Sequence, residues 1–264
     1  MFVHPSGVDV SRSALRFLTQ QLCRHRRGIG SRRRRPSAGR QALLTLAHLR
    51  VGHTYAQLAA GFGVGTTTTH RYPTEAVELL AALAPGLAVA VRTASVKAFV
   101  ILDGTLLPID RIAADRPFCS GKRKKHGMNR QVIADPFGQM LWASPALPGG
   151  VHDVRVAGEH GIVDALSEAD TTCRADKGHW GAGGTVGIPY WGRWETLSAG
   201  QKAVNRCHAK IRALVERAIA TLKSWRLLRT LRCSTLRISE LVQAVLTLHL
   251  TSSERGQRGS VITA

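Results

Sequence analysis

The sequence is short of acidic residues. It has 17 Asp and Glu against 37 Lys and Arg, a formal net charge of +20, and no acidic residue stands between Asp9 and Glu75. A charge balance this basic argues against a cationic or neutral macromolecular partner. It predicts a polyanionic one, and nucleic acid is favoured over a membrane surface.

Long apolar runs are also missing. The longest apolar stretch, Ala76 to Val91, is interrupted by Glu78 and by Pro85-Gly86, so it falls short of the roughly 20 residues that a membrane-spanning helix needs. The first residues lack the basic start and apolar run of a secretory signal. We therefore expect no membrane span and a cytoplasmic location.

Cysteine is scarce and scattered. The five cysteines are odd in number and never form a C-x-x-C pair, which argues against a disulfide framework and against a zinc site. Reduced thiols are the expectation.

The pattern along the chain predicts two domains of different class. The hydrophobic fraction of 44% supports a sizeable core. Residues 1–40 are rich in arginine, and we expect a flexible basic arm that contacts DNA phosphates without reading sequence. Residues 41–92 are predicted to form a small all-α domain, residues 93–252 an α/β domain with a mixed sheet, and residues 253–264 a tail.

Residues 54–72 have the pattern of a helix-turn-helix. Thr54 and Gln57 predict a capping box at the start of one helix, and the glycine-rich stretch 61–65 predicts the turn. The following helix would present four polar side chains to a DNA groove, namely Thr67, Thr68, His70 and Arg71. Because proline disfavours a helix interior, we expect this helix to kink or end before Pro73. A purely structural helical bundle is the alternative.

Three carboxylates stand at informative positions. Asp103 follows the apolar run 98–102 and Asp176 follows the short run 171–175, both read as strands, while Glu216 lies on a basic helix expected over residues 201–229. A carboxylate that closes a buried strand needs a compensating charge or metal. Three carboxylates without His or Cys partners suit Mg²⁺ or Mn²⁺, and two such ions can support phosphoryl transfer. For Glu216 alone, the alternative is an ion pair with Arg212.

Further polar residues surround these three. His152 and Asp153 could support the metal ligands or form an ordinary hydrogen-bonded pair, and Asn205, Arg212 and Lys223 could contact the DNA backbone or orient Glu216. A basic loop is expected to contact phosphate and comprises Lys122, Arg123, Lys124 and Lys125. Three tryptophans are expected to be core or packing residues, namely Trp191, Trp194 and Trp225.

Four short motifs together resemble a known family. They are Asp103-Gly104-Thr105, His152-Asp153, Ala175-Asp176-Lys177-Gly178 and Val215-Glu216-Arg217, the last followed by Leu222-Lys223-Ser224-Trp225. In this order they are similar to bacterial insertion-sequence transposases of the DDE endonuclease superfamily, in the Harbinger-related group. The resemblance covers about residues 41 to 250, including the helix-turn-helix.

The resemblance implies an RNase H-like catalytic core in which Asp103, Asp176 and Glu216 hold two Mg²⁺ or Mn²⁺ ions. It implies cleavage at insertion-sequence ends and transfer of the 3′-hydroxyl strand to target DNA. The substrate would be double-stranded DNA with terminal inverted repeats, held by a homodimer or higher assembly at the nucleoid.

Two residues depart from the family pattern. His179 stands where these proteins usually carry Tyr after Asp-Lys-Gly, and Pro73 interrupts the DNA-reading helix. Two alternatives therefore stay open. One is a catalytically decayed copy that acts only as a DNA-binding protein, and the other is a host nuclease that acts on structured nucleic acid through the same core.

Overall fold

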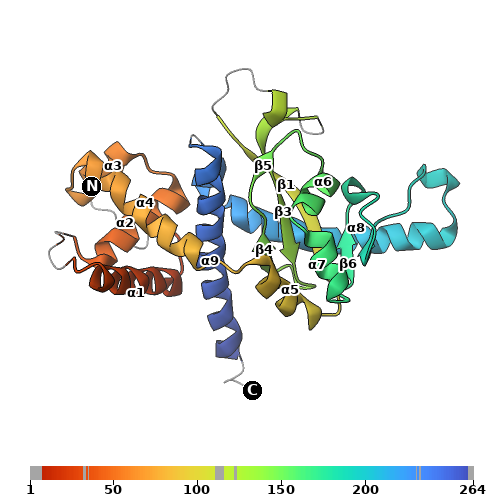
Figure 1. Ribbon diagram of the computed structural model, residues 1–264, viewed down its shortest axis with the longest axis horizontal. Coiled ribbons are helices and arrows are strands. Elements are labelled where there is room, and N and C mark those ends of the chain that lie inside the picture. Colours follow the sequence, from red (N-terminus) through yellow and green to blue (C-terminus); the bar gives the residue numbers. More distant parts are fainter. Residues whose placement is uncertain are drawn as a thin grey trace. The chain divides into compact units, whose positions relative to one another are not determined.

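The chain divides into two compact units. The computed structural model (Figure 1) describes residues 8–31, 34, 36–110, 116–121, 124–229, 231 and 233–260, with the side chains of 116, 235 and 253–260 left aside. The helical unit takes the residues before Pro85 together with the segments 223–230 and 240–264; the sheet unit takes 85–222 and 231–239.

The helical unit begins with a helix where the sequence predicted a flexible arm. The prediction for residues 1–40 is wrong over α1 (Arg12–Gly28), which the Ser11 hydroxyl caps by accepting a hydrogen bond from the Ala14 amide. Leu18 and Leu22 lie on one face of α1 and are fully buried, and α1 packs against α2 (Ala38–Val51). This apolar stripe stabilises the helix although its last turn is basic.

The predicted helix-turn-helix is confirmed as a pair of helices. Thr54 and Gln57 form the capping box of α3 (Tyr55–Phe62), and Gly63 ends it in the left-handed conformation with φ of 61°. That backbone conformation favours glycine, because other residues meet steric strain there. The chain then enters α4 (Thr66–Ala82), which packs on α3 and α2.

Pro73 does not end α4, so of the two expectations, a kink or a helix end before Pro73, the helix end is wrong. Pro73 is buried within the helix, followed on the same side by Val77 and Leu80. The Gln41 side-chain amide donates to the Tyr72 carbonyl at 3.4 Å. Burial of this face offsets the roughly 3 kcal/mol that an interior proline costs a helix.

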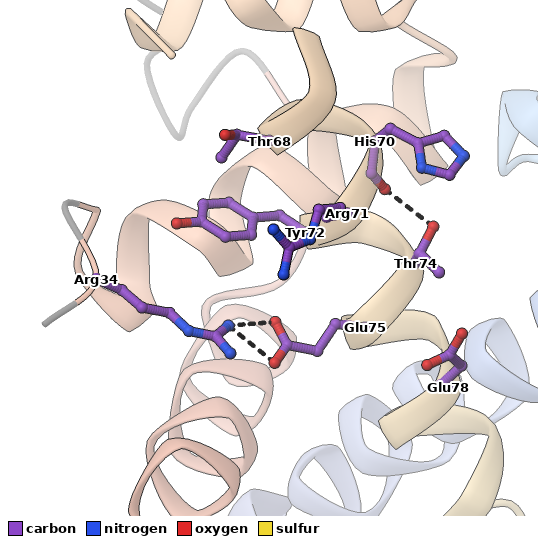
Figure 2. A pocket seen from close by; sticks show the side chains of 8 residues that line it. All are labelled: Arg34, Thr68, His70, Arg71, Tyr72, Thr74, Glu75 and Glu78. Carbon is purple, nitrogen blue, oxygen red and sulfur yellow. Dashed lines mark hydrogen bonds and ion pairs between the residues drawn. The ribbon is translucent and has the colours of Figure 1, made fainter. Parts of the chain in front are cut away.

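Glu75 joins four segments of the helical unit. Its carboxylate accepts hydrogen bonds from Arg34 at 2.6 and 2.8 Å and from Gln41 of α2 at 2.7 Å, and His25 of α1 lies 3.1 Å away. Figure 2 shows the Arg34 guanidinium meeting this carboxylate. Burial alone would raise the pKa of Glu75, but the bonds from Arg34 and Gln41 and the charges of Arg34 and His25 lower it below its ordinary 4.5.

The sheet unit is built on a mixed sheet. Its strands are β1 (Val100–Pro108), β2 (Cys119–Ser120), β3 (Lys125–Ala134), β4 (Met140–Ala143), β5 (Leu147–Pro148), β6 (Cys173–Ala175) and β7 (Val186–Gly187). The order is β2-β3-β1-β6-β7, and β4 and β5 also pair with β3. β1 is antiparallel to β3 and parallel to β6. The expected hairpin of residues 131–134 with 140–143 is confirmed as β3 and β4.

Helices complete the core of the sheet unit. They are α5 (Leu87–Ser95), α6 (Asp153–Glu159), α7 (Ile162–Glu168) and α8 (Ala199–Lys223). Residues of α5, α6 and α7 share one apolar cluster with β1, β3, β4 and β6. On α8, Val215, Ala218, Ile219 and Leu222 are buried as one stripe, which confirms the apolar face expected there. The helix ends at Lys223, before the predicted Arg229, and a short 3₁₀ helix, η5 (Arg226–Arg229), follows.

The domain boundaries differ from the predicted ones. The units divide between Ala84 and Pro85, before the expected boundary at residue 93, because α5 packs with the sheet. The C-terminal helix α9 (Thr235–Ser260) was expected to belong to the sheet domain up to residue 252. From Glu240 onward it belongs to the helical unit, where the Thr247 hydroxyl donates to the Leu80 carbonyl at 2.9 Å.

Within the described part of the chain, no single helix is long and apolar enough to cross a membrane, and one bent pair, α4 with α5, reaches that length and composition only when the two are taken together.

We predict that Glu75→Gln lowers the free energy of unfolding by about 2 kcal/mol, because Arg34 and His25 lose a charged partner. The depressed pKa of Glu75 means that its contribution is present above pH 4.5 and is lost as the pH falls through its folded-state pKa. Chemical denaturation of the full chain, followed by circular dichroism at pH 7 and at pH 3, measures both effects.

Glu78→Gln is the matched control, since Glu78 is exposed on the same helix. Its effect should stay within about 0.5 kcal/mol. Equal effects of the two substitutions at pH 7 would contradict the assigned role of Glu75.

Candidate functional site

Two of the three predicted carboxylates meet in the sheet unit. The parallel register of β1 and β6 places Leu102 opposite Ala175, so the next residues, Asp103 and Asp176, stand side by side. The sequence suggested that Asp103 ends a strand, but Asp103 lies inside β1. Asp176 directly follows β6. Both are buried, with 7% and 4% of their surface exposed.

The electrostatics of Asp103 reflect this crowding. The pKa of Asp103 is raised to about 6, chiefly by burial and then by the charge of Asp176, with a smaller contribution of the same sign from Asp153. Arg212 and His179 act in the opposite direction. The protein's own cations therefore leave the charge of Asp103 undercompensated, as expected for a site that binds a further cation.

His179 is fully buried between Asp176 and a glutamine of β3. Its Nδ1 lies 3.0 Å from the Asp176 Oδ1 and its Nε2 lies 2.8 Å from the Gln131 Oε1. The Gly178 amide donates to the same Asp176 oxygen at 2.8 Å. These contacts fix one oxygen of Asp176 and the orientation of its carboxylate.

Asp153 extends this hydrogen-bonded group from the first turn of α6. Its Oδ1 accepts from Asn129 at 2.8 Å and from Gln131 at 3.3 Å. The carboxylate also packs closely against Gly104 and Gly178, where a Cβ atom on either residue would collide with it. A continuous chain of contacts thus runs from Asp153 through Gln131 and His179 to Asp176.

Asn129 and Gln131 were not among the predicted site residues. Both are buried polar residues of β3, two positions apart and therefore on the same face of the strand. Polar residues at this spacing in an otherwise buried strand were the available signal. His152 was predicted beside Asp153, but it is exposed at the N-cap of α6 and makes no side-chain capping bond.

Glu216 is not grouped with the two aspartates. Its side chain is 62% exposed, and its carboxylate lies 3.7 Å from the Arg212 Nη2, which is the ion pair considered as the alternative. Within the described ranges, no three His, Cys, Asp or Glu side chains are arranged to hold a metal ion. Arg212 connects the two groups, since its charge also acts on Asp103.

The remaining candidates of the sheet unit have different surroundings. The Asn205 side chain holds the backbone of Tyr190, accepting from its amide at 2.7 Å and donating to its carbonyl at 3.1 Å. Lys124 and Lys125 are exposed at the turn between β2 and β3, while Lys122 and Arg123 lie outside the described residues. Lys223 is the last residue of α8 and belongs to the helical unit.

The candidate DNA-reading residues lie at the start of α4. Thr67, His70 and Arg71 are exposed and Thr68 is half-buried. Thr68, His70 and Arg71 line a pocket with a cavity volume of about 550 Å³ (Figure 2). The ring of His70 packs edge-on against Tyr55 of α3, at 5.2 Å between centroids. The first two turns of α4 thus present polar side chains to solvent.

The prediction that Trp191 and Trp194 are core residues is wrong. Both are exposed, by 59% and 48%, whereas Trp225 is buried as predicted. Trp180 is exposed by 66%. The glycine-rich segment that carries these side chains, 180–194, contains only one short strand, which leaves their rings without a sheet to cover them.

Comparison with known proteins gives concordant matches. A family model described as DDE superfamily endonuclease matches residues 102–249, and one described as helix-turn-helix of DDE superfamily endonuclease matches residues 37–86. The chain is 30% identical over 204 residues to a Streptomyces albus G protein named "Putative transposase for insertion sequence element IS112". The matched region covers 73% of this chain and 71% of the relative. No solved structure matches significantly.

We predict that Asp103→Asn stabilises the metal-free protein at pH 8. A pKa raised from 3.8 to about 6 corresponds to up to roughly 3 kcal/mol. The contribution of wild-type Asp103 is fully present below pH 3.8 and is lost as the pH rises through about 6. Denaturation in EDTA at pH 8 and at pH 5 should show a stabilisation that shrinks at the lower pH.

Asp164→Asn makes the same chemical change at an exposed position of α7 and should shift stability by less than about 0.5 kcal/mol. A pH-independent effect of Asp103→Asn would contradict the charge burial described above.

Proposed function

The chain belongs to the DDE superfamily of endonucleases, and on this premise we propose that it cleaves DNA at the ends of an insertion sequence and joins the freed 3′-hydroxyl to target DNA. The proposed substrate is double-stranded DNA with terminal inverted repeats, bound by a homodimer or higher assembly at the nucleoid. The mixed sheet with Asp103 and Asp176 on adjacent parallel strands supports an RNase H-like core.

The observation that carries this proposal is the burial of two carboxylates side by side. Asp103 and Asp176 offer hard oxygen ligands, and the raised pKa of Asp103 indicates negative charge that the surrounding cations do not balance. This donor set fits Mg²⁺ or Mn²⁺. When bound, two such ions would activate the attacking hydroxyl and stabilise the leaving oxygen of a phosphoryl transfer.

The residues around the aspartates would keep them in place. The Gly178 amide and His179 hold the Oδ1 oxygen of Asp176 and so orient its carboxylate, which would serve as a metal ligand. Gln131 and Asp153 in turn hold the imidazole through the hydrogen-bonded chain. In this proposal His179 positions Asp176 by hydrogen bonding, which is how it would serve where the family usually carries Tyr.

Glu216 is proposed as the third metal ligand, supplied by α8. The charge of its partner Arg212 also acts on Asp103 and lowers its pKa. Glu216 therefore lies one helical turn from a residue that interacts with the aspartate site. The exposed ion pair with Arg212 is worth only a few tenths of a kcal/mol. A divalent cation at the aspartates would outweigh that pairing.

A second candidate function is favoured by the position of Glu216 itself. Its 62% exposure and its pairing with Arg212 are what a catalytically decayed copy would show if it still bound insertion-sequence ends through the helix-turn-helix.

We predict metal-dependent cleavage of duplex DNA that carries the element's own terminal repeat. Cutting should occur in Mg²⁺ or Mn²⁺ and be absent in EDTA. Asp176→Asn and Glu216→Gln should each reduce the rate by at least about a hundredfold, because each removes a charged metal ligand and keeps the side-chain shape. Glu195→Gln, an exposed carboxylate in the same unit, is the control and should cut normally.

Each outcome of this assay decides between the candidates. Cutting that survives Glu216→Gln would remove Glu216 from the metal site. Tight binding of the repeat by the wild type without cutting in either metal would favour the decayed copy. Cutting that ignores the terminal repeat would favour a general nuclease.

We also predict that Arg71→Ala weakens binding to the repeat duplex and lowers the salt dependence of the binding constant by about one unit, because one phosphate contact is lost. Titrations at several salt concentrations, followed by fluorescence anisotropy in EDTA, measure both quantities. Arg92→Ala removes the same charge from an exposed position of α5 and should change neither. If both variants behave alike, α4 does not read DNA.

A further inference from the structure

The exposed tryptophans of the sheet unit lie in one segment among cations. Three of the five tryptophans fall within residues 180–194, and each has about half or more of its surface exposed. We call Trp180, Trp191 and Trp194, together with Lys177, Lys202 and Arg206, the aromatic surface. Rings of this size are normally buried, so their common exposure requires an explanation that core packing does not provide.

The aromatic rings and the cations are in direct contact. Trp180 and Trp191 meet edge to face at 6.3 Å between centroids, and the Lys177 ammonium lies 5.1 Å above the Trp191 ring. Around Trp194, Lys202 and Arg206 of α8 both lie 5.9 Å from the ring centroid. These contacts hold the rings in fixed orientations and place positive charge beside them.

The aromatic surface adjoins the pair of aspartates. Lys177 directly follows Asp176 in the chain and reaches Trp191. The backbone beside Trp191 is fixed to α8, since Asn205 makes two hydrogen bonds with Tyr190. The surface is therefore attached both to the 3₁₀ helix after Asp176 and to the helix that carries Glu216.

We propose that the aromatic surface binds unpaired nucleotides of the DNA end, next to the phosphate that is cleaved. This inference rests on the proposed function. Bases stack on exposed aromatic rings while neighbouring cations contact the phosphates, and such binding tolerates any sequence. A base pair inside a duplex already has both faces stacked on its neighbours, so the nucleotides that stack on these rings are unpaired ones.

Charge complementarity favours DNA over a protein partner for this surface. The cations that touch its rings are Lys177, Lys202 and Arg206, in a chain of net charge +20. Arg193 adds a further positive charge between Trp191 and Trp194, and between Lys177 and Arg206 the sequence contains one acidic residue, Glu195. A second copy of this chain would bring the same positive charge and be repelled.

The test is the binding of fluorescein-labelled oligo(dT) of about ten nucleotides, followed by anisotropy in EDTA so that no cleavage occurs. Trp191→Ala should weaken binding about tenfold, and Trp191→Tyr should retain most of the affinity. Neither substitution changes the net charge, so the purely electrostatic part of the binding stays constant. A blunt duplex of the same length should bind Trp191→Ala as tightly as the wild type.

Phe137→Ala is the matched control, because it removes an exposed aromatic ring from the turn between β3 and β4. It should leave the affinity for oligo(dT) unchanged. Unaltered oligo(dT) binding by Trp191→Ala would overturn the proposal, as would an equal loss of affinity for the blunt duplex. Wild-type self-association that disappears in Trp191→Ala would also overturn it and assign the surface to a protein interface.

Failure of this inference is distinguishable from failure of the proposed function. The binding assay needs no metal, whereas repeat-end cleavage by the wild type is measured separately in Mg²⁺ or Mn²⁺. Normal cleavage by the wild type, together with unaltered oligo(dT) binding by Trp191→Ala, would overturn only the proposed role of the aromatic surface. Absent cleavage with a selective loss of oligo(dT) binding would leave a single-strand-binding surface on a protein that is not a nuclease.

Discussion

The structure depends on the burial of two negative charges next to each other. Parallel pairing of β1 with β6 is what brings the backbones of Asp103 and Asp176 together. The cost appears in the raised pKa of Asp103. Two surrounding residues offset part of it: the buried imidazole of His179 contacts Asp176, and the charges of Arg212 and His179 lower the pKa of Asp103, whereas Asp153 raises it. A divalent cation bound at Asp103 and Asp176 would remove the cost of burying the two carboxylates.

Much of this arrangement could be predicted from the sequence. Carboxylates placed after apolar runs identified Asp103 and Asp176, because strand periodicity and the cost of burying charge are local properties of the chain. Asn129 and Gln131 were missed because their spacing shows only that they share a strand face, and their contacts with Asp153 and His179 depend on how β3 packs against other segments. Glu216 shows the opposite limit: its isolation among cations drew attention, but its distance from the aspartates depends on how α8 packs, and sequence spacing does not determine that.

The helical unit shows where composition was a poor guide. The arginine-rich N-terminal region was expected to be flexible, yet α1 forms because Leu18 and Leu22 outweigh the repulsion among its basic residues. Pro73 was expected to kink or end α4, yet the helix continues past it and buries the same face. Glu75 matters here because acidic residues are so few: one carboxylate pairs with Arg34 and His25 and accepts a hydrogen bond from the Gln41 amide, on three other segments. Tertiary packing overrode local preference in each case.

The two units are interleaved along the chain. The helical unit takes its residues from both ends, and α9 begins in one unit and finishes in the other. The carbonyl of Leu80, near the end of α4, accepts a hydrogen bond from Thr247, which lies 167 residues further along the chain. A single genetic crossover near codon 84 between the genes of two related proteins would therefore combine α4 of one protein with α9 of the other. Such hybrids would be mismatched in the interior of the helical unit, so DNA specificity and the catalytic core are expected to be inherited together and not exchanged as separate modules.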